Sequence, residues 1–150
     1  SGERTPIHDP HARGAFFGLN LTHTRADMFR AVVEGIAAGT AHVLETYAEV
    51  SASPDRILAV GGGTKNQLWL QATSDFGQVP QHVCEKTIGA SYGDAFLAAC
   101  AIGGAQPQDI LTWNPNATTV QPEKVPAYVT QYPLWKRLYT QTKDLMQALP

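Results

Sequence analysis

The spacing of apolar residues along the chain predicts four helices and two strands. From Thr24 to about Val50 apolar side chains recur at steps of three and four, the period of an amphipathic helix. Thr24 is suited to cap the start of this helix, with Asp27 in its first turn. Two short apolar runs, residues 56–60 and 79–83, are typical of buried strands. Further helices are expected over residues 66–76, 90–102 and 133–149.

Two segments between these elements are expected to be irregular. Residues 1–23 are interrupted by prolines and glycines, and residues 106–126 are rich in proline and asparagine. Gly35 and Gly39 lie on neighbouring turns of the first helix, where each costs about 1 kcal/mol relative to alanine. We therefore expect a close packing partner for them. The order strand, helix, strand, helix predicts an α/β domain with helices on a sheet.

Composition narrows the class of protein. A length of 150 residues corresponds to about one domain with a single core. The net charge of −2 offers no positive field to a nucleic acid, so none is expected as a partner. No apolar run approaches the roughly 20 residues that span a bilayer, so no membrane partner is expected either. Cys84 and Cys100 are too few for a disulfide framework, and we expect reduced, buried thiols in a cytoplasmic protein.

The most informative stretch is the glycine turn, residues 61–64, between the first strand and the second helix. Glycine permits positive φ and lets a ligand approach the backbone closely. The free N–H groups at the start of a helix favour a phosphate or another anion. A plain strand-to-helix turn would explain the same residues equally well.

Two known glycine motifs do not fit this turn well. Lys65 lies outside the frame that a phosphate-binding P-loop requires. The dinucleotide-binding pattern is matched by Gly61 and Gly63, with Glu85 about 20 residues further on. However, Asn66 stands where that pattern needs its third glycine, and a long helix precedes the strand that should come first. An NAD-binding oxidoreductase domain is therefore the less favoured alternative.

Four blocks of sequence, taken together and in order, resemble the C-terminal half of FGGY-family carbohydrate kinases, most of all their xylulokinase-like members. The first is the opening loop, SGERTP followed by DP, ARG and FFGL, within residues 1–19. The second is RAVVEGIA in the long helix, residues 30–37. The third is the glycine turn with Asn66 and Trp69, and the fourth is GASYGDA, residues 89–95. The resemblance covers nearly the whole chain.

This resemblance implies an actin-like, ribonuclease-H-like α/β fold with a mixed sheet flanked by helices. Residues 1–150 would form a single, partial domain of that fold. The family's reaction is transfer of the ATP γ-phosphoryl group to a sugar hydroxyl, here of a pentulose such as xylulose or a related polyol. ATP and Mg²⁺ would lie in a cleft between two domains. The sugar and the catalytic aspartate would belong mainly to the N-terminal domain.

The resemblance also assigns residues in the glycine turn. It places Gly62 and Gly63 against the adenosine or its phosphates, and Asn66 within hydrogen-bonding reach of the adenine or ribose. It assigns no catalytic or metal-binding residue to this stretch, because the base is expected upstream of Ser1. Residues 1–150 alone are therefore expected to be inactive, with the N-terminal kinase domain as their partner. A homodimer and a non-catalytic nucleotide-binding or assembly module are the further alternatives.

Four other residues have interpretations that a structure can test. Asp9 precedes Pro10, and a turn-capping carboxylate is favoured there over a catalytic group. Glu3 and Arg4 are expected to form a local ion pair that braces the opening loop. A packing role in the core is favoured for Trp69 over stacking on a base.

Overall fold

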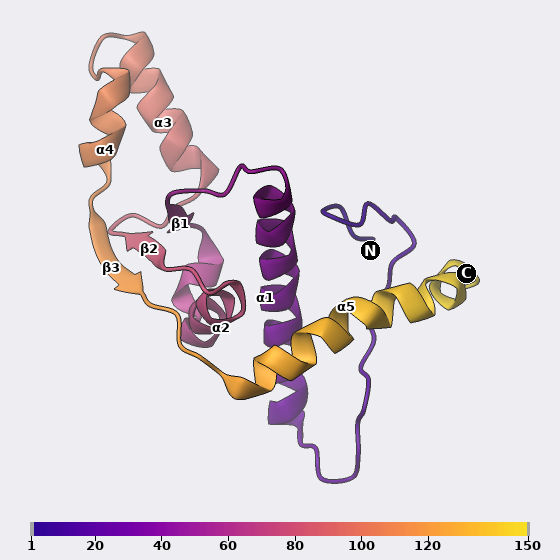
Figure 1. Ribbon diagram of the computed structural model, residues 1–150. Helices are drawn as coiled ribbons and strands as arrows, with labels where there is room; N and C mark the ends of the chain where they lie inside the picture. Colours follow the sequence, from indigo (N-terminus) through magenta and orange to yellow (C-terminus); the bar gives the residue numbers. More distant parts are fainter. Residues whose placement is uncertain (1, 150) are drawn as a thin grey trace.

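The computed structural model describes residues 2–149, and Figure 1 shows its arrangement of helices around a small sheet. The elements in chain order are α1 (Arg25–Glu49), β1 (Ile57–Ala59), the 3₁₀ turn η1 (Gly62–Lys65), α2 (Gln67–Gly77), β2 (Gln81–Cys84), α3 (Ala90–Ala101), the 3₁₀ turn η2 (Pro107–Asp109), α4 (Ile110–Trp113), β3 (Asn116–Val120) and α5 (Pro126–Gln147). α1 stands beside α2, and α5 crosses α1 (Figure 1).

The predicted helix from Thr24 is confirmed, cap included. The Thr24 hydroxyl accepts a hydrogen bond from the Asp27 backbone N–H, and the Asp27 carboxylate accepts one from the Thr24 N–H at 2.7 Å. This reciprocal pair satisfies two of the backbone donors that a helix start leaves open.

The sheet is mixed, as predicted. β1 and β2 run parallel, with Ile57 opposite Gln81, and β3 pairs antiparallel with β2, with Val120 opposite Gln81. The middle strand is β2. A parallel pair needs a crossover connection, and α2 supplies it between β1 and β2.

The expectation that residues 106–126 are irregular is wrong. They contain η2, α4 and β3. β3 is polar, and its first three residues are exposed, so it has none of the apolar signal that marks a buried strand. Its β-branched residues and its backbone pairing with β2 define it instead. α5 also begins at Pro126 rather than at Pro133, which lies inside the helix.

Small residues let α1 and α2 pack closely. Val33, Ala37, Ala38 and Ala41 of α1 are buried, and Ala72 is the apolar residue buried on α2. α2 also buries Thr73, Ser74 and Asp75.

A polar network holds α2 to the strands. The Gln81 amide Nε2 donates to the Leu70 carbonyl at 2.7 Å and to the Ser74 hydroxyl at 2.9 Å. The Ser74 hydroxyl donates in turn to the Val120 carbonyl at 3.2 Å. Asp75 accepts from the Glu123 backbone N–H at 2.7 Å. Because these buried polar groups have partners, their burial is not penalised, and they fix the position of α2.

α5 supplies the packing partner that Gly35 and Gly39 predict. The Trp135 indole lies over both glycines: a Cβ on Gly35 would lie 3.9 Å from its Nε1 and a Cβ on Gly39 4.0 Å from its Cη2, which is ordinary contact. Tyr128 stacks on Phe76 of α2 with ring centroids 3.8 Å apart. α5 therefore joins α1 and α2 at one face.

The opening loop is held by its own carboxylates. Asp9 accepts from the His11 N–H and from the Tyr139 hydroxyl of α5, each at 2.8 Å, which confirms its turn-capping role. The Glu3 carboxylate accepts from the backbone N–H groups of Arg4 and Thr5. The prediction of a Glu3–Arg4 ion pair is therefore wrong: no such pair is found among the described residues, and the Glu3 carboxylate accepts hydrogen bonds from the loop backbone instead.

Several large apolar side chains are left uncovered. Leu97 and Ile102, in and just after α3, are 65% and 85% exposed, and Phe29, Val32 and Ile36 form an open stripe near the start of α1. Exposed apolar surface of this extent is typical of a face that contacts another part of a protein. None of the helices within residues 2–149 combines the length and the apolar character needed to cross a membrane.

The contact of Trp135 with α1 leads to a prediction about Gly39. Gly39→Ala should raise the free energy of unfolding by up to about 1 kcal/mol, because alanine favours the helix and its methyl group fits against the indole. Gly39→Leu should lower it by about 1–3 kcal/mol, because the longer side chain displaces Trp135. Urea unfolding followed by circular dichroism measures both. Equal stability of the two variants would contradict this packing.

The bond between Asp9 and Tyr139 predicts a pH dependence. The Tyr139 hydroxyl and then the His11 N–H lower the pKa of Asp9 from its ordinary value of 3.8. A carboxylate with a lowered folded-state pKa stabilises the fold above its unfolded-state pKa, and this contribution is lost as pH falls through the folded-state pKa. Tyr139→Phe should therefore lose less stability than the wild type from about pH 5 to about pH 2. Thermal unfolding across this range tests it, and parallel curves would refute it.

Candidate functional site

The glycine turn joins β1 to α2 and is fixed by its own hydrogen bonds. The Gly61 N–H donates to the Thr87 carbonyl at 2.6 Å, which connects the turn to the segment after β2. The Thr64 hydroxyl donates to the Gly61 carbonyl at 2.7 Å, and the Asn66 N–H donates to the Gly63 carbonyl at 3.0 Å. The turn therefore has a defined shape before any ligand binds.

The three glycines of the turn have different surroundings. Gly61 has a φ of +85°, a conformation that favours glycine. Gly62 is exposed, and no described atom lies within 4 Å of the position that its Cβ would take. A Cβ on Gly63 would lie 3.0 Å from Cζ3 of Trp69, so this glycine faces a side chain of the protein.

Asn66 caps α2. Its Oδ1 accepts a hydrogen bond from the Trp69 backbone N–H at 3.2 Å. An asparagine side chain carries one acceptor oxygen and an NH₂ group with two donors, and the cap uses only the oxygen. Among residues 2–149, no protein group accepts from that NH₂ group. Asn66 can therefore cap the helix and still donate to a ligand.

The structure brings the three predicted residues together. Gly62, Gly63 and Asn66 lie within one turn at the start of α2, at the carboxyl end of β1. In open α/β sheets, ligands bind at this end of the strands. Trp69 is half-buried and packs against Gly63, so it makes a packing contact as predicted but lies at the edge of the core rather than within it. Thr87 was not predicted, because it contributes only a backbone carbonyl, which leaves no signal in a sequence.

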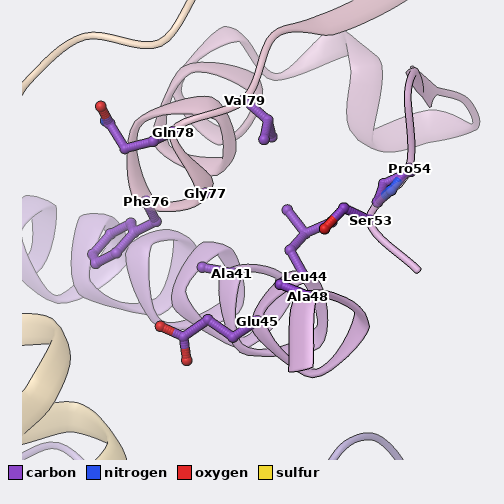
Figure 2. A pocket seen from close by; sticks show the side chains of 10 residues that line it. All are labelled: Ala41, Leu44, Glu45, Ala48, Ser53, Pro54, Phe76, Gly77, Gln78 and Val79. Carbon is purple, nitrogen blue, oxygen red and sulfur yellow. The ribbon is translucent and has the colours of Figure 1, made fainter. Parts of the chain in front are cut away.

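Two cavities lie against α2. The smaller, of about 160 Å³, lies between α2 and the strands and begins at Thr64 and Gln67, next to the glycine turn. The larger, of about 300 Å³, lies between the ends of α1 and α2 and the segment after α1 (Figure 2). Its lining is mostly apolar, with Glu45 and Gln78 as its longer polar side chains, and includes none of the predicted site residues. Size alone therefore does not mark the site.

The surroundings of the turn bear on metal binding. Among residues 2–149, no three His, Cys, Asp or Glu side chains form a group that could hold a metal ion. Lys65, at the end of η1, is exposed. The turn thus offers backbone N–H groups, an amide and a lysine, which suit a ligand with phosphate groups better than a bare cation.

Comparison with known proteins agrees with this geometry. The model of the FGGY family of carbohydrate kinases, C-terminal domain, matches residues 1–102. A xylulose kinase from Bacillus subtilis is 33% identical to the chain over 157 residues, which cover 99% of this chain and 30% of that protein. The chain thus spans about a third of the length of the curated relatives it matches.

Solved structures give the fold. A xylulose kinase from Brucella ovis superposes with a TM-score of 0.85 at 34% identity, over 97% of this chain and 31% of that one. A glycerol kinase from Plasmodium falciparum, solved with ADP, has a TM-score of 0.77 at 20% identity, over 95% of this chain and 29% of that one. The predicted actin-like fold is confirmed. With two-thirds of its length matched by the family model, the chain belongs to the FGGY family of carbohydrate kinases, in its C-terminal domain.

Proposed function

We propose that this chain is the ATP-binding part of a carbohydrate kinase that transfers the γ-phosphoryl group of ATP to a sugar hydroxyl. The acceptor is a pentulose such as xylulose, or a related polyol. The observation that carries the proposal is a preformed glycine turn at the start of α2 in a member of this kinase family. The xylulose kinases and the gluconokinase among the relatives support the class of acceptor.

In this proposal the turn forms one wall of the nucleotide site. Gly62 and Gly63 lie against the adenosine or its phosphates, and the Asn66 NH₂ group donates to the adenine or the ribose. Three observations support this: the open space at Gly62, the NH₂ group that the cap leaves unused, and the ADP with which the similarly folded glycerol kinase was solved. The N–H groups of η1 and α2 add a favourable field for phosphate oxygens.

Phosphoryl transfer needs more groups than this chain provides. It requires an in-line hydroxyl, a base that takes its proton, and cations that hold the phosphates. Mg²⁺ bound with ATP would supply positive charge to balance the charge on the phosphates. We assign it no ligand within residues 2–149, where no suitable group of side chains exists. The base and the sugar contacts are proposed to come from an N-terminal kinase domain, for which the greater length of the relatives leaves room.

The uncovered apolar faces support such a partner. Leu97 and Ile102 at α3, together with the open stripe on α1, would be covered by the N-terminal domain. A homodimer through the same faces stays a prediction. Cys84 and Cys100 are both free thiols, which supports the proposed cytoplasmic location.

The proposed function is tested by separating binding from catalysis. The chain alone should bind ADP in calorimetry, yet it should yield no xylulose phosphate from ATP and xylulose, because it lacks the base. Fused to the N-terminal part of the Bacillus subtilis xylulose kinase, it should form product. Phosphorylation by the chain alone would contradict the division of labour. A fusion that binds ADP without turnover would favour the non-catalytic module, and absence of ADP binding would refute the nucleotide role.

A pair of Asn66 variants separates capping from ligand binding. Asn66→Ser keeps a capping oxygen but removes the NH₂ group, so it should fold with nearly wild-type stability and bind ADP about fivefold more weakly, the equivalent of one hydrogen bond. Asn66→Ala should bind ADP as weakly and also lose about 1 kcal/mol of unfolding free energy. Calorimetry and urea unfolding measure the two effects. Wild-type ADP affinity in Asn66→Ser would remove Asn66 from the site.

A further inference from the structure

Two adjacent glycines of the turn lack a side chain for different reasons. A Cβ on Gly63 would lie 3.0 Å from Cζ3, 3.2 Å from Cε3 and 3.5 Å from Cη2 of Trp69. These atoms belong to a rigid ring, so even a methyl group at Gly63 requires the indole or the turn to move. Around Gly62 the described part of the chain leaves the corresponding space open. The protein therefore accounts for the missing side chain at Gly63 but not at Gly62.

Three contacts link Gly63, Asn66 and Trp69 into a closed unit. The Gly63 carbonyl accepts from the Asn66 N–H at 3.0 Å. The Asn66 Oδ1 accepts from the Trp69 N–H at 3.2 Å. The Trp69 ring in turn contacts Gly63 and occupies the space next to the position that a Cβ would take. Each member thus constrains the next, and the Asn66 side chain has its orientation fixed by the same residue that supports the glycine.

We propose that Trp69 is a positioning residue of the nucleotide site: its ring sets the place of Gly63 and Asn66, while Gly62 is the glycine that faces the nucleotide. This assignment rests on the proposed function. Gly63 then contributes its backbone to the wall of the site and lacks a side chain because the indole occupies that space. Gly62 lacks a side chain so that the nucleotide can approach its backbone.

The physical reason lies in the shape of η1. A 3₁₀ turn has poorer hydrogen-bond geometry than an α-helix and rarely extends beyond three or four residues, so contacts with neighbouring side chains add to the hydrogen bonds that hold it. The indole is the large side chain that contacts this turn at Gly63. A smaller side chain at position 69 would leave space into which the turn could move. The Asn66 NH₂ group and the Gly62 backbone would then lose their fixed separation.

A cycle of stability measurements tests the role of Gly63. Gly63→Ala should lower the melting temperature because its methyl group meets the ring. In the background of Trp69→Leu, where the rigid ring is gone, the same substitution should have little further effect. The double variant Gly63→Ala/Trp69→Leu therefore reports the coupling. A melting temperature unaffected by Gly63→Ala, or an equal loss in both backgrounds, would overturn this role. This measurement needs no ligand.

ADP titrations test the ligand side. Gly62→Ala should weaken ADP binding at least tenfold without lowering the melting temperature, whereas the control Gly14→Ala, at another glycine with open surroundings, should leave both unchanged. Trp69→Leu should weaken ADP binding severalfold at temperatures where it is fully folded. Wild-type ADP affinity in either Gly62→Ala or Trp69→Leu would overturn the assignment.

Tryptophan emission separates positioning from a merely structural role. ADP should change the emission of the wild type but not that of Trp69→Phe. The control is Trp113→Phe, which should keep the ADP response, because Trp113 of α4 packs on Phe96 of α3. An ADP response that persists in Trp69→Phe would overturn the proposal. If the wild-type chain binds no ADP in calorimetry, the proposed function fails and the assignment of Gly62 fails with it. The melting temperatures of the single and double variants still decide whether Gly63 must lack a side chain because of Trp69.

Discussion

The buried side chain of Gln81 is the contact on which the rest of the structure depends. It reaches from the middle strand to the Leu70 carbonyl and the Ser74 hydroxyl, and so fixes α2 over the sheet. α2 in turn carries the glycine turn at its start and packs on α1 along its length. A buried amide is tolerated only when its hydrogen bonds are made, so this contact also selects one position of the helix on the sheet.

α5 holds together α1, α2 and the opening loop, as Gln81 holds α2 to the sheet. Trp135 lies over the glycines of α1, Tyr128 stacks on Phe76 of α2, and Tyr139 binds Asp9 in the opening loop. One helix thereby touches three segments that are distant in the sequence. The family model matches residues 1–102 and so does not include this helix, although the relatives match nearly the whole chain. The glycine turn thus lies inside the part that the family model matches, and the helix that packs on α1 and α2 lies outside it.

Elements that are determined by residues close together in the sequence could be predicted. A strand that is determined by pairing with a distant segment could not. The cap at Thr24 and the amphipathic pattern after it are local signals, and α1 follows them. The glycines of α1 even predicted a partner, although not that it would be Trp135. β3 carries no apolar alternation, and its run of β-branched residues is a weak signal, so its pairing with β2 could not be predicted from its own residues. At the turn, the family resemblance assigned Gly62, Gly63 and Asn66 alike, whereas the contact between Trp69 and Gly63 could be found only from the coordinates.

The hydrogen bond from the Gly61 N–H to the Thr87 carbonyl has a mechanical consequence. β1 and β2 are parallel neighbours, and this bond joins the two segments that leave their carboxyl ends. The segments that follow β1 and β2 are therefore hydrogen-bonded to each other and are not two independent loops. Because Thr87 lies three residues before α3, this bond ties the position of the glycine turn to the position of the segment that leads into α3.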